Sequence, residues 1–184
     1  MSATNRGSER NPKDFYATPK NVICNFLDNH TLRNGPILDP SAGHGVFGKV
    51  LNEYGYYDVD AVEVREEEKS SLTDIYENVY INDFLSWTPE RDYKTIITNP
   101  PFSLAMLFIK KCFELQKKDT EVIMLLGLAF LESKKRHDFW QGCPVNNLYV
   151  LSNRPSFTNN GKTDACAYAF YVWNNSGNQV IKVI

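Results

Sequence analysis

The sequence predicts a single α/β domain in which a mostly parallel sheet of seven strands has an antiparallel last strand and helices on both faces. Three observations favour this fold. Short apolar and β-branched runs alternate with stretches of helical periodicity, as in parallel sheets joined by crossover helices. The 184 residues are enough for one domain with its own core. The last two apolar runs have no helical stretch between them, so we expect the final strand to be inserted as a hairpin.

The expected elements follow in chain order. Residues 1–14 are small and polar and are expected to form a flexible arm ahead of a domain at 15–184. A first helix is expected at 19–29, where apolar residues recur at helical spacing and Pro19 suits the first turn. Strands are expected at 36–40, 58–64, 79–83, 93–99, 121–127, 146–152 and 166–174. Further helices are expected at 45–55, 66–78, 104–118 and 133–141.

Composition favours a soluble, intracellular (cytoplasmic) protein that does not enter a membrane. The longest apolar run, at 122–131, is about half a membrane span, and the N-terminal residues form no signal sequence. The four cysteines have neither metal-type nor redox-type spacing, so we expect reduced thiols and no metal site. The net charge is −2, with twelve acids against four bases at 53–94. Bases are in slight excess at 1–20 and 131–164, which form either a phosphate-facing side or ordinary solvated surface.

Polar side chains stand at the ends of the first four expected strands. In open α/β sheets, ligands bind beyond the carboxyl ends of the strands. For any one of these residues, a turn or a helix cap is an alternative explanation. Together they predict one polar edge of the sheet. The residues are Asp39, Glu63, Asp83 and Asn99.

The loop after the first strand indicates a nucleoside cofactor. Gly43, Gly45 and Gly48 have the G-x-G-x-x-G spacing of dinucleotide-binding, Rossmann-like folds, and Glu63 stands where an acid can bind ribose hydroxyls. Asp39 argues against a dinucleotide, because its carboxylate would repel a pyrophosphate at ~4 Å by about 4 kcal/mol per charge pair. S-adenosylmethionine has a ribose, no phosphate, and an ammonium group that Asp39 could pair with directly or through water. It is therefore the cofactor we expect.

Residues 81–85, INDFL, are expected to serve the adenine of that cofactor. Asp83 can accept a hydrogen bond from the adenine amino group, and Phe84 can pack on the ring. Core packing is an equally good explanation for Phe84.

The tetrapeptide Asn99-Pro100-Pro101-Phe102 follows a β-branched run. The two prolines make it a stiff extended segment, because proline fixes φ and restricts the residue before it. The side-chain oxygen of Asn99 and the Pro100 carbonyl could then accept from the two N–H bonds of an exocyclic adenine amino group and direct its lone pair at a methyl donor. Phe102 offers a face for base stacking, worth ~1–3 kcal/mol. A strand-terminating turn with a buried aromatic is the alternative.

From about Phe15 to Trp173 the chain resembles class I S-adenosylmethionine-dependent methyltransferases, in particular γ-type adenine-N6 DNA methyltransferases of phage and prophage type. LDPSAGHGVF resembles the glycine loop, VEV the ribose acid, NDFL the adenine site, and NPPF the catalytic motif [D/N/S]-P-P-[Y/F/W]. FYATP resembles the segment before the first core helix. The resemblance implies cofactor contacts from Tyr16, Thr18 and Pro19, and from Pro40 and Ser41 in the glycine loop.

The same resemblance implies a nucleic-acid substrate. RPSFTNNGKTDACAYAFYVW is similar to a hairpin whose aromatic, here Phe157, lines the target-base pocket, although Phe157 could equally anchor a loop. A target adenine in duplex DNA would have to be flipped out. The expected phosphate contacts, whose alternative is solvated surface, are Lys134, Lys135, Arg136, Arg154 and Lys162.

Restriction-type members carry a separate target-recognition domain, and we expect none here. Selectivity would then come from the loops at 1–18, 102–106, 130–140 and 154–165, or from a partner subunit or second copy. Three other functions stay open: adenine-N6 methylation of RNA, glutamine-N5 methylation of protein by a related N-P-P-Y motif, and a catalytically silent subunit that binds cofactor. Phe102 in place of tyrosine disfavours the second, and the intact motifs disfavour the third.

Overall fold

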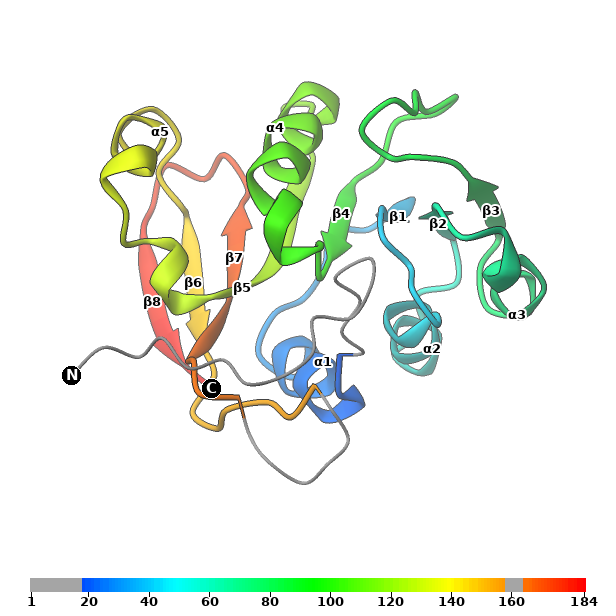
Figure 1. Cartoon of the computed structure of the whole chain (residues 1–184), viewed down its shortest axis with the longest axis horizontal. Helices are drawn as coiled ribbons and strands as arrows, with labels where there is room; N and C mark the ends of the chain where they lie inside the picture. Colours follow the sequence, from blue (N-terminus) through cyan, green and yellow to red (C-terminus); the bar gives the residue numbers. More distant parts are fainter. Residues whose placement is uncertain (1–17, 158–163) are drawn as a thin grey trace.

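A computed structural model of the chain describes residues 18–157 and 164–184. It has one sheet of eight strands in the order β3-β2-β1-β4-β5-β7-β6-β8 (Figure 1). The strands are β1 (Ile37–Asp39), β2 (Val59–Glu63), β3 (Asn78–Ile81), β4 (Thr95–Thr98), β5 (Glu121–Gly127), β6 (Asn147–Val150), β7 (Tyr168–Trp173) and β8 (Val180–Val183). The helices are α1 (Lys20–Leu27), α2 (Val46–Glu53), α3 (Lys69–Thr73), α4 (Ala105–Leu115) and α5 (His137–Gly142). The predicted α/β fold is confirmed.

One strand runs against the others, as the hairpin argument predicts. Strands β1 to β5 pair in parallel, whereas β7 is antiparallel to β5 and to β6 and lies between them (Figure 1). The eighth strand, β8, is an addition to the seven expected, and it pairs in parallel with β6. Ile181 and Val183 of β8 are 75% and 66% exposed, so β8 extends the sheet and adds little to the core.

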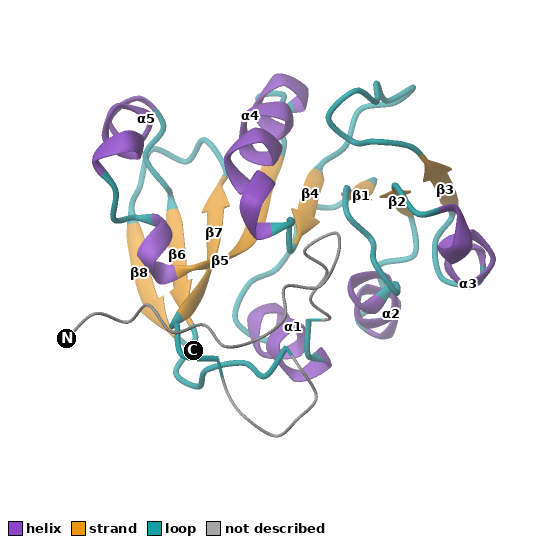
Figure 2. Ribbon diagram, in the orientation of Figure 1, coloured by secondary structure: helices purple, strands orange, loops and turns teal. Residues whose placement is uncertain are grey.

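The sheet is covered on both faces, and each face has its own apolar core. Figure 2 shows α1 and α2 on one face and α4 and α5 on the other. Alternate strand residues point to opposite faces, so that Ile97 packs with the α1 side and its neighbour Ile96 with the α4 side. Phe26 of α1 stacks on Phe170 of β7 with ring centroids 4.2 Å apart. Burial of each such side chain contributes roughly 1.5–3 kcal/mol, which fixes α1 against the sheet.

Two helices are shorter than expected because local hydrogen bonds divide them. Residues 66–78 form a 3₁₀ turn, η1 (Glu66–Glu68), followed by the short α3, and the chain then turns at Tyr76. Residues 133–141 begin with a second 3₁₀ turn, η4 (Lys134–Arg136), capped by the Ser133 side chain, which accepts from the Lys135 N–H at 3.1 Å. Two further 3₁₀ turns are η2 (Phe102–Leu104) and η3 (Leu128–Phe130).

Within the two described ranges, the longest helix is α4 with 11 residues, and none could cross a membrane.

Candidate active site

The strand ends converge as predicted. Asp39 and Glu63 are the last residues of β1 and β2, and Asn99 directly follows β4. The parallel register sets Ile37 opposite both Val59 and Thr95, so these ends meet at one edge of the sheet. The residues there join into a network of hydrogen bonds rather than facing solvent separately.

The glycine loop wraps tightly over this edge. Gly43 and Gly45 have φ of 58° and 76°, which L side chains rarely adopt. The Gly43 N–H donates to Oε2 of Glu63 at 2.8 Å, tying the loop to β2. A Cβ on Gly48 would lie 2.5 Å from the ring of Tyr76, so the third glycine allows α2 to pack closely on that ring. The glycine spacing therefore has both a conformational and a packing cause.

Asp39 is fully buried beneath the loop. Its carboxylate accepts from Tyr76 Oη at 2.7 Å, from Thr98 Oγ1 at 3.0 Å and from the Ser41 N–H at 3.3 Å. Burial raises the pKa of Asp39 to about 6, although these three hydrogen bonds act in the opposite direction. With no exposed surface, the carboxylate has no direct contact to offer a ligand in this structure. Pairing with an ammonium through water remains a prediction.

Glu63 is already oriented by the protein. One carboxylate oxygen accepts from Gly43, while the other accepts from the Arg65 N–H at 3.1 Å and from Arg65 Nε at 2.8 Å. Arg65 also pairs with Glu68 at 3.1 Å, and Glu68 accepts from His44 in the glycine loop at 2.9 Å. The sequence analysis missed Arg65, although a base two residues after the expected ribose acid was a visible signal.

Asn99 is held at both its side chain and its backbone. Its Nδ2 donates to Thr18 Oγ1 at 3.0 Å, and its carbonyl accepts from Ser41 Oγ at 3.1 Å. Its side-chain oxygen, Oδ1, is buried and has no hydrogen-bond partner among residues 18–157 and 164–184. Buried polar atoms are nearly always paired, so an unpaired acceptor at a strand end calls for a functional explanation. Pro100 is buried, and Pro101 is extended with φ −53° and ψ 126°, as the prolines predict.

Three residues after Asn99, Phe102 joins a cluster of three aromatic rings. The Phe102 ring lies edge-on to that of Phe157, with centroids 6.1 Å apart, and it lies 6.0 Å from Tyr168. Phe157 and Tyr168 are 4.9 Å apart. The structure thus brings together the two aromatics predicted from the sequence and adds Tyr168, which the sequence analysis had placed only in a strand. The Tyr168 hydroxyl donates to Asp164 at 2.8 Å, which anchors the ring.

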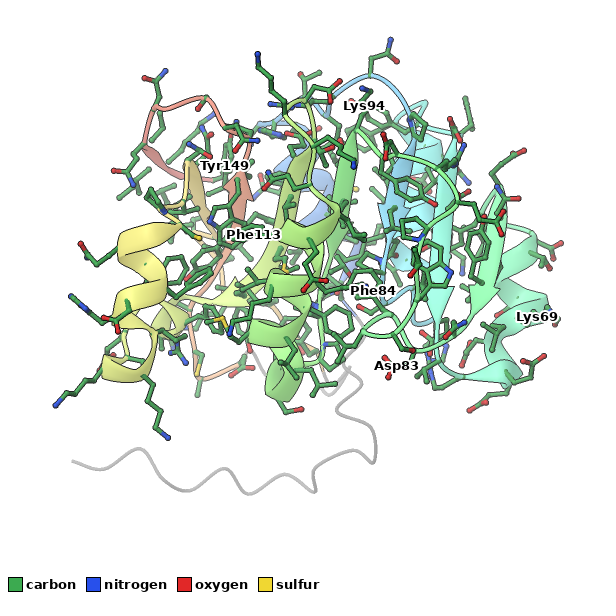
Figure 3. All side chains as sticks on the ribbon, turned by 90° about the horizontal axis from the view of Figure 1, so that it is seen from above. Lys69, Asp83, Phe84, Lys94, Phe113 and Tyr149 are labelled. Carbon is green, nitrogen blue, oxygen red and sulfur yellow. The ribbon has the colours of Figure 1, made fainter. Side chains whose placement is uncertain are left out.

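Phe84 lies in the core, as its alternative explanation proposed. It is 2% exposed and packs 5.1 Å from the Phe108 ring of α4, so no ring face is open to a ligand. Asp83 is exposed, and its side chain accepts from the Leu85 N–H at 3.0 Å (Figure 3). Asp83 therefore caps a turn and keeps solvent-facing lone pairs, while stacking by Phe84 would require the ring to leave the core.

The expected phosphate contacts differ in availability. Lys134, Lys135 and Arg154 are exposed. Arg136 instead donates to the carbonyls of Ala129, Phe130 and Glu132 at 3.3, 2.7 and 2.9 Å, and its guanidinium lies 4.4 Å from the Phe130 ring. These hydrogen bonds from Nε and Nη2 hold the loop after β5, and a phosphate contact from Arg136 stays a prediction.

The remaining expected cofactor contacts have the following positions. Pro19 precedes α1, Pro40 is buried after β1, and Ser41 bonds to the motif as described. Tyr16 and Lys162 lie outside the described residues. Within the described parts of the chain, no group of three or more histidine, cysteine or acidic side chains is arranged to hold a metal ion.

No protein-family sequence profile matches the chain, and no curated protein matches its sequence. Solved structures do share its fold. A proposed RNA methyltransferase from Pyrococcus horikoshii is 20% identical with a TM-score of 0.69, over 95% of this chain and 91% of that one. A proposed class I S-adenosylmethionine-dependent methyltransferase from Listeria monocytogenes is 14% identical with a TM-score of 0.68, over 91% and 65%. The modification subunit of a proposed type I restriction enzyme from Vibrio vulnificus YJ016 is 15% identical with a TM-score of 0.64, over 99% and 48%.

At these identities, the likeness shows the fold alone. It is the fold of class I S-adenosylmethionine-dependent methyltransferases, as the resemblance implied. The chain spans about half the length of the restriction-enzyme subunit.

Proposed function

We propose that the protein transfers a methyl group from S-adenosylmethionine to the exocyclic N6 amino group of adenine in DNA. The observation that carries this proposal is the buried Oδ1 of Asn99, unpaired among the described residues, in the tetrapeptide that ends with Phe102. An amino group can supply the donor that this acceptor lacks once the substrate has displaced the atoms that cover it, and an aromatic ring is a surface on which a base can stack. The fold shared with the two proposed methyltransferases supports the same chemistry.

The residues at the strand ends fit S-adenosylmethionine. The glycine loop has no side chains at Gly43 and Gly45, so its backbone can approach a ligand closely. Glu63 has both oxygens fixed, and its Oε2, which accepts only one hydrogen bond, retains a lone pair for a ribose hydroxyl. Asp39, ionised above a pKa of about 6, supplies negative charge that favours a cationic ligand nearby. When bound, the cofactor supplies an electrophilic methyl group on a sulfonium.

The chain's own residues would orient the attacking amine. The Asn99 oxygen accepts one N–H, and the Pro100 carbonyl is proposed to accept the other, which favours a tetrahedral nitrogen with its lone pair free. As the nitrogen–carbon bond forms, the sulfur–carbon bond breaks and its electron pair stays on sulfur. Positive charge that grows on the nitrogen is stabilised by the two fixed oxygens. Because an amide is a very weak base, the surplus proton then leaves to solvent.

DNA is our first choice of polymer, with RNA as the second candidate. Exposed Lys134, Lys135 and Arg154 suit the phosphates of either. RNA is favoured by one observation, the near-complete overlap with the proposed RNA methyltransferase. Sequence selectivity is proposed to reside in the loops or in a partner subunit or second copy.

The test is to incubate the protein with labelled S-adenosylmethionine and, in parallel, duplex DNA, total RNA and cell protein. Label in DNA as N6-methyladenine is expected. Asn99→Ala should lower the rate by about 10²–10³ while the cofactor dissociation constant stays nearly unchanged. Asn178→Ala, at an exposed asparagine in the loop after β7, is the matched control and should keep full rate. Full activity of Asn99→Ala, or label only in RNA or protein, would contradict the proposal.

A further inference from the structure

Thr18 holds the side chain of Asn99 in one orientation. Its hydroxyl oxygen accepts from Asn99 Nδ2 at 3.0 Å, across 81 residues of sequence. Thr18 is only 7% exposed, so water competes little for this bond. The nitrogen and oxygen of an amide point in different directions from one planar group. Fixing the nitrogen therefore fixes where the oxygen points.

Thr18 is itself well positioned to act as an anchor. A residue before proline is restricted to extended backbone, and Pro19 follows directly with φ −63° and ψ 136°. The Pro19 carbonyl accepts from the Val22 N–H at 3.1 Å in the first turn of α1. Helix α1 is held on the sheet by the stacking of Phe26 on Phe170. The hydroxyl thus stands two residues before a helix that is packed on the sheet.

The backbone of Asn99 is fixed independently of Thr18. Ser41 Oγ, from the glycine loop, donates to the Asn99 carbonyl at 3.1 Å, and Pro100 stiffens the chain beyond it. The freedom left to the residue is rotation of its side chain. A half-turn of the amide would exchange an acceptor for a donor, and a donor would repel a substrate amino group. The Thr18 hydroxyl can donate as well as accept, so its bond fixes the plane of the amide; in this structure Nδ2 is turned toward Thr18, and Oδ1 is the atom left without a partner among the described residues.

We propose that Thr18 is a positioning residue for the methyl transfer, in addition to any contact it makes with the cofactor. This inference rests on the proposed function of Asn99. Before the substrate arrives, the Thr18 hydroxyl holds the plane of the Asn99 amide, with Nδ2 toward Thr18 and Oδ1 left for the substrate. The binding energy of the substrate is then not used to turn the amide, which is the advantage of a preorganised site.

Two substitutions separate this role from cofactor binding. Thr18→Val removes the hydroxyl with little change of shape, and we expect kcat to fall about 10- to 100-fold. The dissociation constant for S-adenosylmethionine should change less than about threefold. Thr18→Ser keeps the hydroxyl and should restore most of the rate. If Thr18→Val weakens cofactor binding while kcat at saturating cofactor is normal, Thr18 is a cofactor contact only and the positioning role is overturned.

A second measurement does not depend on activity. In ¹⁵N-labelled protein, the side-chain amide signal of Asn99, assigned by its loss in Asn99→Asp, reports the hydrogen bond directly. Thr18→Val should shift this signal and speed its proton exchange, whereas Thr18→Ser should leave it near its original place. An unchanged signal in Thr18→Val would overturn the proposal.

The matched control is Thr120→Val. Thr120 is fully buried just before β5, and its hydroxyl donates to the Tyr93 carbonyl at 2.7 Å. This change should lower the melting temperature without altering kcat or the Asn99 signal, and an equal fall in kcat would show that Thr18→Val acts through stability alone. Wild-type protein inactive on every polymer would overturn the proposed function and this role with it. Wild-type activity with unchanged Thr18→Val kinetics would overturn the Thr18 role alone.

Discussion

Replacing Tyr76 with phenylalanine removes one oxygen atom from the buried network at the strand ends. That oxygen donates to Asp39 at 2.7 Å and accepts from the Gly48 N–H at 3.0 Å. A hydrogen bond to a charged group is worth about 1.5–3 kcal/mol, and a buried N–H left unpaired costs about 1–3 kcal/mol. Because the two effects overlap, we expect Tyr76→Phe to lower the free energy of unfolding by about 2–4 kcal/mol at pH 8.

The effect should depend on pH. Burial raises the pKa of Asp39 from 3.8 to about 6, so between these pH values the folded protein holds a proton that the unfolded chain has released. The stability contributed by this proton is fully present below pH 3.8 and is lost as the pH rises through 6. At pH 4.5 the carboxyl is protonated, and Tyr76→Phe removes a neutral hydrogen bond worth about 0.5–1.5 kcal/mol. The loss should therefore be smaller at pH 4.5 than at pH 8.

Urea unfolding at both pH values measures this difference, provided the slope m is unchanged. Tyr54→Phe is the matched control, because the Tyr54 hydroxyl also donates to a carboxylate, Asp28, at 2.7 Å, but at an exposed site. Tyr54→Phe should lower the free energy of unfolding by less than about 0.5 kcal/mol. Equal losses for the two variants, or a Tyr76→Phe loss that does not change with pH, would refute the reasoning about Asp39.

Three other predictions concern the loops and the cofactor. Gly45→Ala should lower the free energy of unfolding by about 2–4 kcal/mol, because φ is +76° and a Cβ would lie 2.6 Å from the nearest side-chain atom. Gly55→Ala, where φ is +85° but the space is open, should lower it by about 1 kcal/mol. Urea unfolding of both variants measures the difference. Arg136→Ala should speed proteolysis of the loop after β5, because it removes the hydrogen bonds that hold the loop. Lys135→Ala, at an exposed side chain, should leave the proteolysis rate unchanged and reduce the salt dependence of DNA binding. The affinity for S-adenosylmethionine, measured by calorimetry, should fall as the pH is lowered from 7 to 5, because Asp39 loses its charge near a pKa of about 6; an equal fall in Asp39→Asn would contradict this assignment.

The sequence predicted the sheet well, because apolar and β-branched runs mark each strand locally and recur along the chain. Strand β5 covers 121–127, as the apolar run indicated, and β7 has the inserted, antiparallel position that the missing crossover helix implied. Helix ends were less predictable. Residues 74–77 continue an acceptable helical pattern, but the chain turns there and the Tyr76 hydroxyl reaches Asp39. A tertiary hydrogen bond of this kind cannot be predicted from the local periodicity of apolar residues.

At the site, motifs predicted which residues would meet but not what each would bond to. The proximity of Phe102 and Phe157 followed from the resemblance. The hydrogen bonds from Arg136 to three backbone carbonyls could not be predicted, because these carbonyls become available only once the loop has folded. Phe84 shows the same limit, since a buried ring and a ligand-stacking ring have identical sequence signals.

The position of β7 also sets the order in which the molecule can be assembled. Residues 168–173 come after β5 and β6 in the chain but lie between them in the sheet (Figure 1). On the ribosome, β5 can pair with β4 early, but β6 has no native neighbour until this late segment has emerged. The contact of Phe157 with Tyr168 belongs to the same late step. The aromatic cluster of Phe102, Phe157 and Tyr168 is therefore completed only after β7 has been synthesised.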